Sequence, residues 1–181
     1  MNSPLYFQSG KSLLPADERL AFAIGVYLDL ALEASGASGG SFYVCDVNKR
    51  ILVPYATLGI PLEYTKLCGE VALGDQCCGR AAMHKRPWIV SDMLTDPLFA
   101  AAREAALNSP IRAGFSIPVL DTAGECIGVL ACVFKAPHTA TPEDILRSET
   151  WADFIGRSIS DAQASRFRRE VSPSDERAIT D

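Results

Sequence analysis

The sequence predicts an α+β domain with an antiparallel sheet, in which two terminal helices cover one face and short helices and loops cover the other. Two observations predict the sheet, because paired β-rich runs stand at residues 41–56 and again at 112–135. A third predicts the helices, since long segments with helical spacing of apolar residues lie toward both ends of the chain.

The composition is that of one soluble globular domain, with 181 residues of which 48% are apolar and 22% are charged. We expect the domain at residues 12–166, between an N-terminal tail at 1–11 and a C-terminal tail or linker at 167–181. A net charge of −5 argues against nucleic acid and anionic membranes as partners. Because the chain shows no long apolar run and no signal-peptide pattern, a cytoplasmic location is expected.

The first helix is expected from Pro15 to about Ala34, where Ser35-Gly36 ends it. Its apolar residues form two stripes. A helix that is apolar nearly all round must be covered on two sides, which predicts the sheet on one side and a partner chain on the other. The two stripes are Leu20, Ile24, Tyr27, Leu28 and Ala31, and Phe22, Val26 and Leu30.

The middle of the chain alternates short strands with short helices. After the hairpin of 41–47 and 51–56, the pattern predicts a helical turn at 62–67, a strand at 70–73 and a helix at 77–84. A strand at 88–90 and a helix at 98–107, opened by Asp96-Pro97, follow.

The hairpin at 112–135 is expected to form the centre of the sheet, because its second strand is apolar on both faces. We place Ile127 with Val129 on one face of that strand and Cys126 with Leu130 on the other. In the first strand, Pro118 lacks an N–H and predicts a bulge or a sheet edge.

Two small residues on one face of that first strand, Gly114 and Ser116, leave room for a ligand against the sheet. The last helix is expected from Pro142 to about Arg169, opened by a capping box at Thr141 and Asp144. Its apolar seam favours a homodimer formed by both terminal helices; the alternative is that the seam only covers the sheet. The seam is Ile145, Ser148, Ala152, Ile155, Ile159 and Ala162.

The six cysteines contain no Cys-x-x-Cys motif and the chain has two histidines, so we assign no metal site. Cys45, Cys126 and Cys132 fall in expected strands and are interpreted as small core side chains. The adjacent Cys77 and Cys78 leave a redox or metal switch open as an alternative, although one inward and one outward thiol is the simpler interpretation.

A series of short motifs between Leu20 and Ala164 resembles a bacterial GAF domain. The resemblance implies a six-stranded antiparallel sheet with a small-molecule pocket on one face and dimerisation through the terminal helices. The motifs are Leu73-Gly74-Asp75, Cys78-Gly79-Arg80-Ala81-Ala82, Arg86-Pro87, Val90-x-Asp92, Asp96-Pro97-x-Phe99, Ile111-Arg112-Ala113, Ser116-x-Pro118-Val119-Leu120, Gly124, Ile127-Gly128-Val129-Leu130 and Phe134-x-x-Pro137-His138.

The resemblance also implies a sensory module that signals to an output domain such as a histidine kinase. It does not identify the ligand or a cofactor. The Asn-Lys-x-Phe-Asp-Glu pattern of cyclic-nucleotide members and the Cys-His pair of bilin-binding members are both absent from the sequence.

Two alternatives to a ligand sensor remain open. One is a ligand-free dimerisation module. The other is a redox enzyme similar to free methionine-R-sulfoxide reductase, because Cys68 and Cys78 match the spacing of two cysteines of that family. The third cysteine, the family's nucleophile, should fall at residues 98–103, where this chain has none, so we expect no catalytic activity.

For the sensor, we expect aromatic side chains to form the pocket walls, while Asp92 and Ser116 offer the polar contacts. Core packing of Trp88 and Phe99, and a turn-forming role of Asp92 at residues 93–95, are the alternatives. The expected pocket residues are Phe42, Cys78, Trp88, Asp92, Phe99, Ser116 and Cys132.

Overall fold

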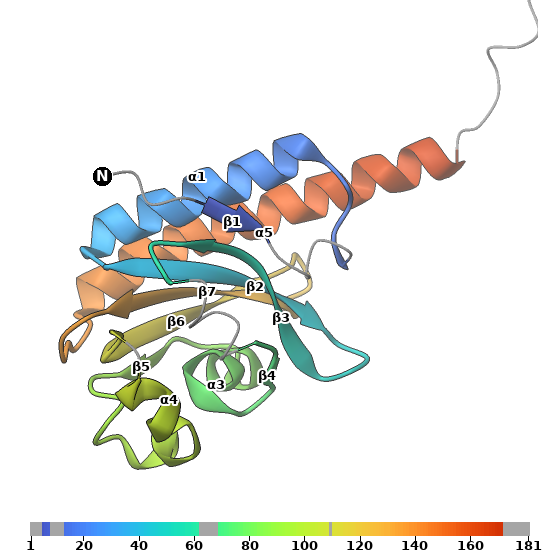
Figure 1. The fold of residues 1–181 in the computed structure, drawn as a ribbon. Helices are drawn as coiled ribbons and strands as arrows, with labels where there is room; N and C mark the ends of the chain where they lie inside the picture. The colour runs from blue at the N-terminus through green and yellow to red at the C-terminus, as the bar shows by residue number, and fades with distance from the viewer. Residues whose placement is uncertain (1–4, 8–12, 62–68, 109, 172–181) are drawn as a thin grey trace, which may run out of the picture.

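The computed structural model describes residues 5–7, 13–61, 69–108 and 110–171. A single antiparallel sheet separates two layers of helices (Figure 1). Helices α1 (Glu18–Ser35) and α5 (Pro142–Val171) cover one face. The other face carries α3 (Gln76–His84), the 3₁₀-helix η2 (Pro97–Ala102) and α4 (Arg103–Leu107). The predicted α+β class and the predicted arrangement of layers are therefore confirmed.

The strands follow the order β1-β3-β2-β7-β6-β5, and β4 pairs with β3. Because β7 lies between β2 and β6, it is central, as its two apolar faces predicted. Strand β5 pairs with β6 only from Gly114 to Ser116, so β6 is itself the sheet edge at Pro118, as expected for proline. The strands are β1 (Leu5–Phe7), β2 (Gly39–Asp46), β3 (Ile51–Leu58), β4 (Val71–Ala72), β5 (Trp88–Val90), β6 (Ala113–Leu120) and β7 (Cys126–Phe134).

Strand β1 was not predicted, because residues 1–11 were left outside the fold. Leu5–Phe7 instead pairs with β3 between Leu58 and Ala56 and extends the sheet to seven strands. The edge of β3 offers backbone hydrogen-bonding groups, and the side chain of Leu5 fits against Gly25 of α1. A Cβ at Gly25 would lie 2.6 Å from Leu5 Cδ2. The boundaries of the domain remain a prediction.

Helix ends follow local capping chemistry. Helix α1 begins at Glu18, three residues later than expected, because the Asp17 carboxylate accepts the N–H of Arg19 at 2.8 Å. Gly36, with φ 64°, ends α1 as expected. At α5, Thr141 and Asp144 form the expected reciprocal capping box, with bonds of 2.9 and 3.2 Å.

The segment expected as one helix at 98–107 divides into η2 and α4. The Phe99 N–H donates to the Asp96 carbonyl at 3.1 Å, which is the i to i+3 spacing of a 3₁₀-helix. The helical turn expected at 62–67 lies outside the described residues.

The start of β7 corrects the assignment of faces. Cys126 packs with residues beneath α3, and Ile127 packs with residues beneath α1 and α5. Val119 pairs with Gly128 and Leu120 with Cys126, so Ile127 is an extra residue in the ladder. This bulge reverses the alternation of side chains that was assumed for Cys126 and Ile127.

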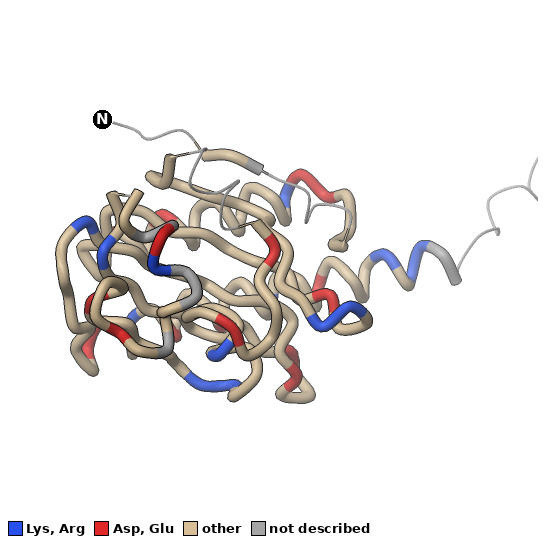
Figure 2. Tube along the Cα trace, turned by 60° about the horizontal axis from the view of Figure 1, so that its bottom comes forward, with Lys and Arg blue, Asp and Glu red and all other residues tan. Residues whose placement is uncertain are grey.

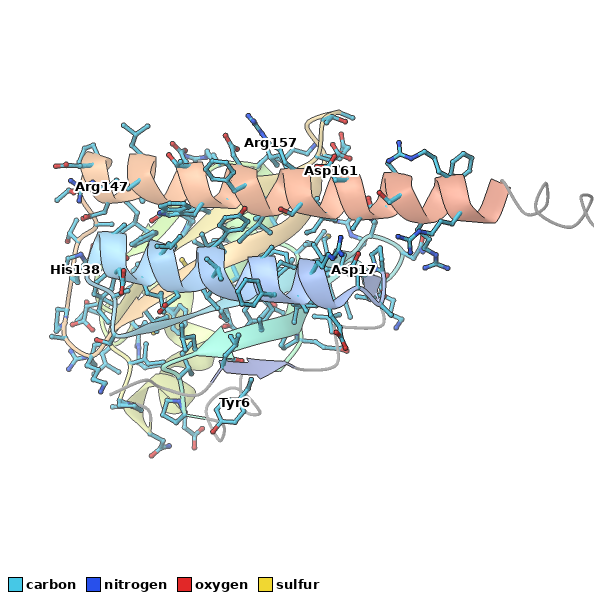
Figure 3. All side chains as sticks on the ribbon, turned by 90° about the horizontal axis from the view of Figure 1, so that it is seen from above. Tyr6, Asp17, His138, Arg147, Arg157 and Asp161 are labelled. Atoms are coloured by element: carbon cyan, nitrogen blue, oxygen red, sulfur yellow. The ribbon has the colours of Figure 1, made fainter. Side chains whose placement is uncertain are left out.

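The face under α1 and α5 is filled by large side chains. Leu28, Phe115, Leu130, Ile155 and Ile159 are all at most 1% exposed. The seam of α5 therefore lies against its own sheet and α1, so it covers the sheet face and does not form a dimer surface. Figure 3 shows α1 and α5 antiparallel and side by side, with Asp17 and His138 at opposite ends of the pair.

The outer surface of this helical layer keeps apolar side chains in solvent. Phe22 is 73% exposed and Val26 is 37% exposed, so these two residues of the second stripe of α1 are not covered by the described part of the chain. Acidic and basic residues are scattered along the described trace, most of which is uncharged (Figure 2). Among the described residues, none of the helices has the length and apolar character needed to cross a bilayer.

Candidate functional site

A transverse row of small residues crosses the middle of the sheet on the face toward α3. Ala131 of β7 pairs with Ser41 of β2 and with Ser116 of β6, and Ser41 pairs with Thr57 of β3. Paired residues of neighbouring antiparallel strands point to the same face, so these four side chains form one line. All four are between 1% and 3% exposed. We call them the small-residue row.

A cavity of about 50 Å³ lies over the small-residue row. It is bounded by two small apolar clusters, one around Tyr43 and Val129 beneath α3 and one around Met93 and Phe99 beneath η2. The space would hold several water molecules and is smaller than the pockets that usually bind drug-sized ligands. The lining residues are Ser41, Tyr43, Thr57, Ile60, Gln76, Cys77, Cys78, Met93, Phe99, Gly114, Phe115, Ser116, Ala131, Cys132 and Val133.

Close backbone contacts hold the walls of the cavity. A Cβ at Gly79 would lie 2.1 Å from the Ala72 carbonyl oxygen, so only glycine lets α3 pack this closely against β4. A Cβ at Gly114 would lie 2.8 Å from the Cys132 carbonyl oxygen and 3.7 Å from Met93 Cε. Gly114 therefore serves close strand packing as well as providing room.

The adjacent cysteines of α3 have different surroundings. The Ser116 hydroxyl donates to Cys78 Sγ at 3.3 Å, across the cavity wall. The Cys77 thiol donates to the Trp88 carbonyl at 3.2 Å, and burial raises its pKa well above the ordinary value. Neither thiol forms a disulfide among the described residues. A thiol whose pKa is raised in this way is a poor nucleophile at neutral pH.

Four of the seven expected pocket residues line the cavity: Cys78, Phe99, Ser116 and Cys132. Cys132 does so from the other face of β7, because its side chain belongs to the core beneath α1 and α5. Burial there raises the pKa of Cys132 to about 12. Its contribution to the cavity is therefore its main chain. Whether these residues bind a ligand remains a prediction.

Phe42 and Trp88 do not line the cavity. Phe42 packs on the opposite face of the sheet, with its ring edge-on to Tyr55 at 5.8 Å. Trp88 pairs with Ser116 at the end of the small-residue row, but its ring stacks on His84 at 5.4 Å. The Arg86 guanidinium lies 5.1 Å from the same ring. The alternative of a packing role for Trp88 fits these contacts.

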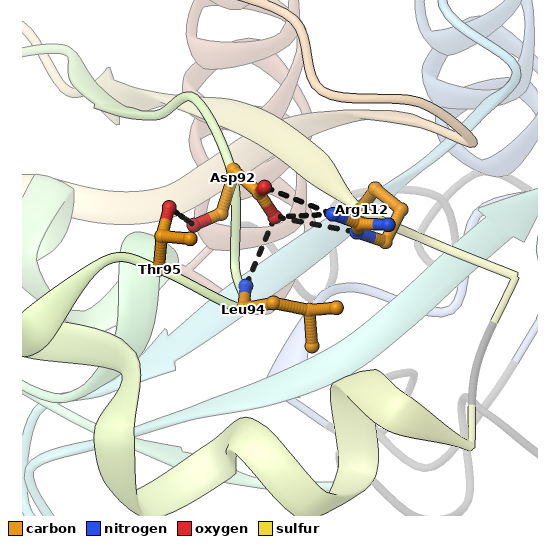
Figure 4. Close-up of polar contacts among 4 residues, drawn as sticks. All are labelled: Asp92, Leu94, Thr95 and Arg112. Carbon is orange, nitrogen blue, oxygen red and sulfur yellow. Dashed lines mark hydrogen bonds and ion pairs between the residues drawn. The ribbon is translucent and has the colours of Figure 1, made fainter.

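Asp92 also lies outside the cavity lining, and Figure 4 shows what occupies its carboxylate. Arg112 binds it in a bidentate pair, with Nη2 2.9 Å from Oδ2 and Nε 3.2 Å from Oδ1. The Leu94 N–H donates to Oδ1 at 3.0 Å. These bonds, that from Arg112 first, hold the pKa of Asp92 below its ordinary value.

Asp92 thus has the turn-forming role that was the alternative to ligand contact. The Met93 N–H donates to the Arg112 carbonyl at 2.7 Å, which fixes the loop on the start of β6 from a second side. The loop carries Met93 and Phe99 into the cavity wall. Asp92 consequently positions the wall without touching the cavity.

Sequence reasoning missed Ser41, Thr57, Ala131, Tyr43 and Met93. The signal for the small-residue row was weak, because each strand contributes only one small residue and the cross-strand register decides whether they align. Among the described residues, no group of three or more His, Cys, Asp or Glu side chains is placed to hold a metal ion.

A family model for the GAF domain matches residues 24–159, which is well over half of the chain. The chain belongs to the GAF domain family. The predicted resemblance is therefore confirmed. No curated protein sequence matches the chain.

Solved structures with the same fold include both sensor domains and enzymes. A domain assigned to a two-component sensor histidine kinase of Sinorhizobium meliloti 1021 superposes with a TM-score of 0.70 at 19% identity, over 86% of this chain and 99% of that one. The GAF domain of a phosphoenolpyruvate-protein phosphotransferase from Coxiella burnetii gives 0.69 at 20% identity, over 87% and 92%.

Free methionine-R-sulfoxide reductase from Neisseria meningitidis, solved with its substrate, gives a TM-score of 0.61 at 21% identity. The match covers 90% of this chain and 99% of the reductase. At these identities the likenesses establish the fold of this GAF domain and leave its function to be argued from its own residues.

Proposed function

We propose that this GAF domain is a cytoplasmic sensory module that binds a small molecule over the small-residue row. The observation that carries the proposal is the contrast between that unfilled space and the close packing on the other face of the same strands. A void in a protein interior loses dispersion contacts and costs stability, so a cavity walled by buried residues favours an occupant.

The route by which binding would reach the terminal helices runs through β6 and β7. Ser116 and Ala131 face the cavity, whereas their neighbours Phe115 and Leu130 face α1 and α5. Gly156 of α5 packs against the Leu120 carbonyl, where a Cβ would lie at 2.5 Å. A ligand signals by this route only if it binds two conformations of the domain with different affinity.

The output of the signal would be a histidine kinase or another output domain, reached through a homodimer of the helical layer. Exposed apolar side chains on α1 and α5 support the dimer: Phe22, Val26, Leu146 and Phe154. Helix α5 extends past the body of the domain (Figure 1), which suits it to carry a shift onward. Sedimentation velocity should give a dimer for the wild type and a monomer for Phe22→Glu; a monomeric wild type contradicts the dimer.

Native mass spectrometry of the purified protein tests the ligand. We expect an adduct of a small molecule that is absent from Ala131→Leu, in which the larger side chain fills the cavity. Ala123→Leu, in the exposed turn between β6 and β7, is the matched control and should keep the adduct. A wild type without any adduct would favour the alternative of a ligand-free dimerisation module.

Hydrogen exchange tests the signalling. With the ligand bound, protection should change both in the loop 92–99 and in α1 and α5. Change confined to the loop would leave a binding protein that does not signal through its helices.

The second candidate is a thiol-dependent reductase of free methionine sulfoxide. Its supporting observation is that Cys78 lines the cavity and accepts a hydrogen bond from Ser116. Cys68 lies outside the described residues, and residues 98–103 contain no cysteine to attack a sulfoxide. Consumption of reductant with free methionine sulfoxide, lost in Cys78→Ser, would establish the enzyme; we expect no such turnover.

A further inference from the structure

The side chains around the cavity carry no formal charge. Among the described residues that line it there is no carboxylate, ammonium, guanidinium or imidazole group. The polar groups are the hydroxyls of Ser41, Tyr43, Thr57 and Ser116, two thiols and the amide of Gln76. Such groups can hydrogen-bond a ligand but cannot neutralise one.

Two charged residues close in sequence to the lining make other contacts. Asp92, next to Met93, is bound by Arg112 in a bidentate pair. The guanidinium of Arg80, two residues after Cys78, lies 5.9 Å from the centre of the Trp88 ring. The Asp92 carboxylate is therefore already paired and is not placed to act as the counter-ion of a ligand in the cavity.

One hydroxyl in the cavity is available for a new bond. Ser41 is 3% exposed and lines the cavity, and no hydrogen bond of its side chain is found among the described residues. Ser116 uses its proton on Cys78 Sγ, which leaves its oxygen able to accept. A ligand with one polar group could therefore form a neutral hydrogen bond at the floor of the cavity.

We propose that the cavity selects small molecules without net charge and rejects carboxylates, phosphates and amines of the same size. This inference rests on the proposed function, because it assumes that a ligand occupies the small-residue row. Moving an unpaired charge out of water into such a site weakens binding by on the order of a hundredfold or more.

The first turn of α3 is the one feature that opposes this inference. Gln76, Cys77 and Cys78 line the cavity, and the positive end of a helix dipole favours anions. At a helix end that effect contributes roughly two- to fivefold in affinity, which is too little to offset the loss of hydration of an unpaired carboxylate. Desolvation therefore decides the outcome.

Three probes of one shape and different charge test the proposal: benzamide, benzoate and benzamidinium. Calorimetry or ligand-observed NMR at pH 7 should show that benzamide binds at least about tenfold more tightly than either ion, because the roughly hundredfold cost of an unpaired charge exceeds the two- to fivefold gain at the helix end. Binding of benzamide should be lost in Ala131→Leu and kept in Ala123→Leu, which is exposed. In Ser41→Ala it should weaken by about three- to tenfold, the effect of one neutral hydrogen bond.

The outcomes separate this inference from the proposed function. If benzoate or benzamidinium binds the wild type as tightly as benzamide, and its binding is also lost in Ala131→Leu, the proposed charge selectivity is wrong. The proposal that the cavity is a ligand site then stands. If benzamide binds equally to Ala131→Leu, or if none of the three binds the wild type, the inference is overturned. In either case the adduct in native mass spectrometry then decides alone whether the cavity is a ligand site.

Discussion

The two faces of the sheet are built from the same strands and differ in almost every other respect. Toward α1 and α5, large side chains such as Phe42, Phe115 and Leu130 are fully buried and fill the layer. Toward α3, the same strands present Ser41, Ser116 and Ala131, and a cavity remains. Because alternate residues of a strand point to opposite faces, one set of strands can stabilise the fold and still leave room for a ligand.

Because the two faces are packed differently, we expect substitutions on them to affect different properties of the domain. Substitutions on the packed face should change the free energy of unfolding, whereas those on the cavity face should change binding. The following predictions test this separation, beginning with the largest effect.

Phe115 and Ser116 are neighbours on β6 that point to opposite faces. Phe115→Ala should lower the free energy of unfolding by about 3–5 kcal/mol, because it leaves a void in a filled core. Ser116→Ala should lower it by less than about 1 kcal/mol, since only a weak bond to Cys78 is lost. Urea titrations of both variants give the two values. Equal effects would mean that the two faces do not differ in their contribution to stability.

Gly156 tests how closely α5 packs on the filled face. Alanine favours a helix over glycine by about 1 kcal/mol, yet its Cβ would lie 2.5 Å from the Leu120 carbonyl oxygen. We expect Gly156→Ala to destabilise the domain by about 1–3 kcal/mol, because the helix must move off the sheet. Gln163→Ala, on an exposed part of the same helix, is the control and should be neutral or slightly stabilising. A higher melting temperature for Gly156→Ala would contradict the contact.

Asp92 tests the loop on the cavity face through pH. Its pKa in the folded state lies below the ordinary value of 3.8, so its contribution is present above about pH 4 and is lost as the pH falls through the folded pKa. Asp92→Asn should therefore show a weaker loss of stability below pH 4 than the wild type. Urea midpoints between pH 7 and pH 2.5 measure this. In a double-mutant cycle of Asp92→Asn with Arg112→Met, the two changes in the free energy of unfolding should not be additive.

The smallest expected effect is a difference between the alkylation rates of two cysteines in the native protein, and its measurement needs no substitution. Burial raises the pKa of both Cys77 and Cys132, so native protein should be alkylated slowly at both by iodoacetamide at pH 8. We expect Cys77, at the cavity wall, to react before Cys132, in the filled core, because less packed regions open more often. Peptide mass spectrometry after timed labelling gives both rates, with urea-unfolded protein as the reference. The reverse order would contradict the comparison of the two faces.

Local chemistry made most of the fold predictable from the sequence. Turn residues at Asp121 and Gly124, the Thr141–Asp144 box and the double apolar faces of β7 each specify a structure by themselves. The bulge at Ile127 was not predictable, because it depends on how β6 and β7 align. Strand β1 was missed because an edge strand is stabilised by its neighbour and carries little signal of its own.

The site was predictable only in part, because it too depends on how neighbouring strands align. Gly114 and Ser116 indicated room on one strand, and Cys78 and Phe99 were placed at the cavity by their elements. Phe42 was expected at the pocket but packs on the opposite face of the sheet, because sequence alternation does not say which face is the open one. The partner of Asp92 could not be inferred from spacing, since Arg112 follows it by 20 residues.

The position of Ala131 at the centre of its line has a consequence for how such a domain changes over evolutionary time. A single longer side chain there would fill the space without disturbing any strand pairing, because the pairing uses only the main chain. If the proposed function holds, gain and loss of sensing would then need a change in one codon, while the scaffold stayed intact.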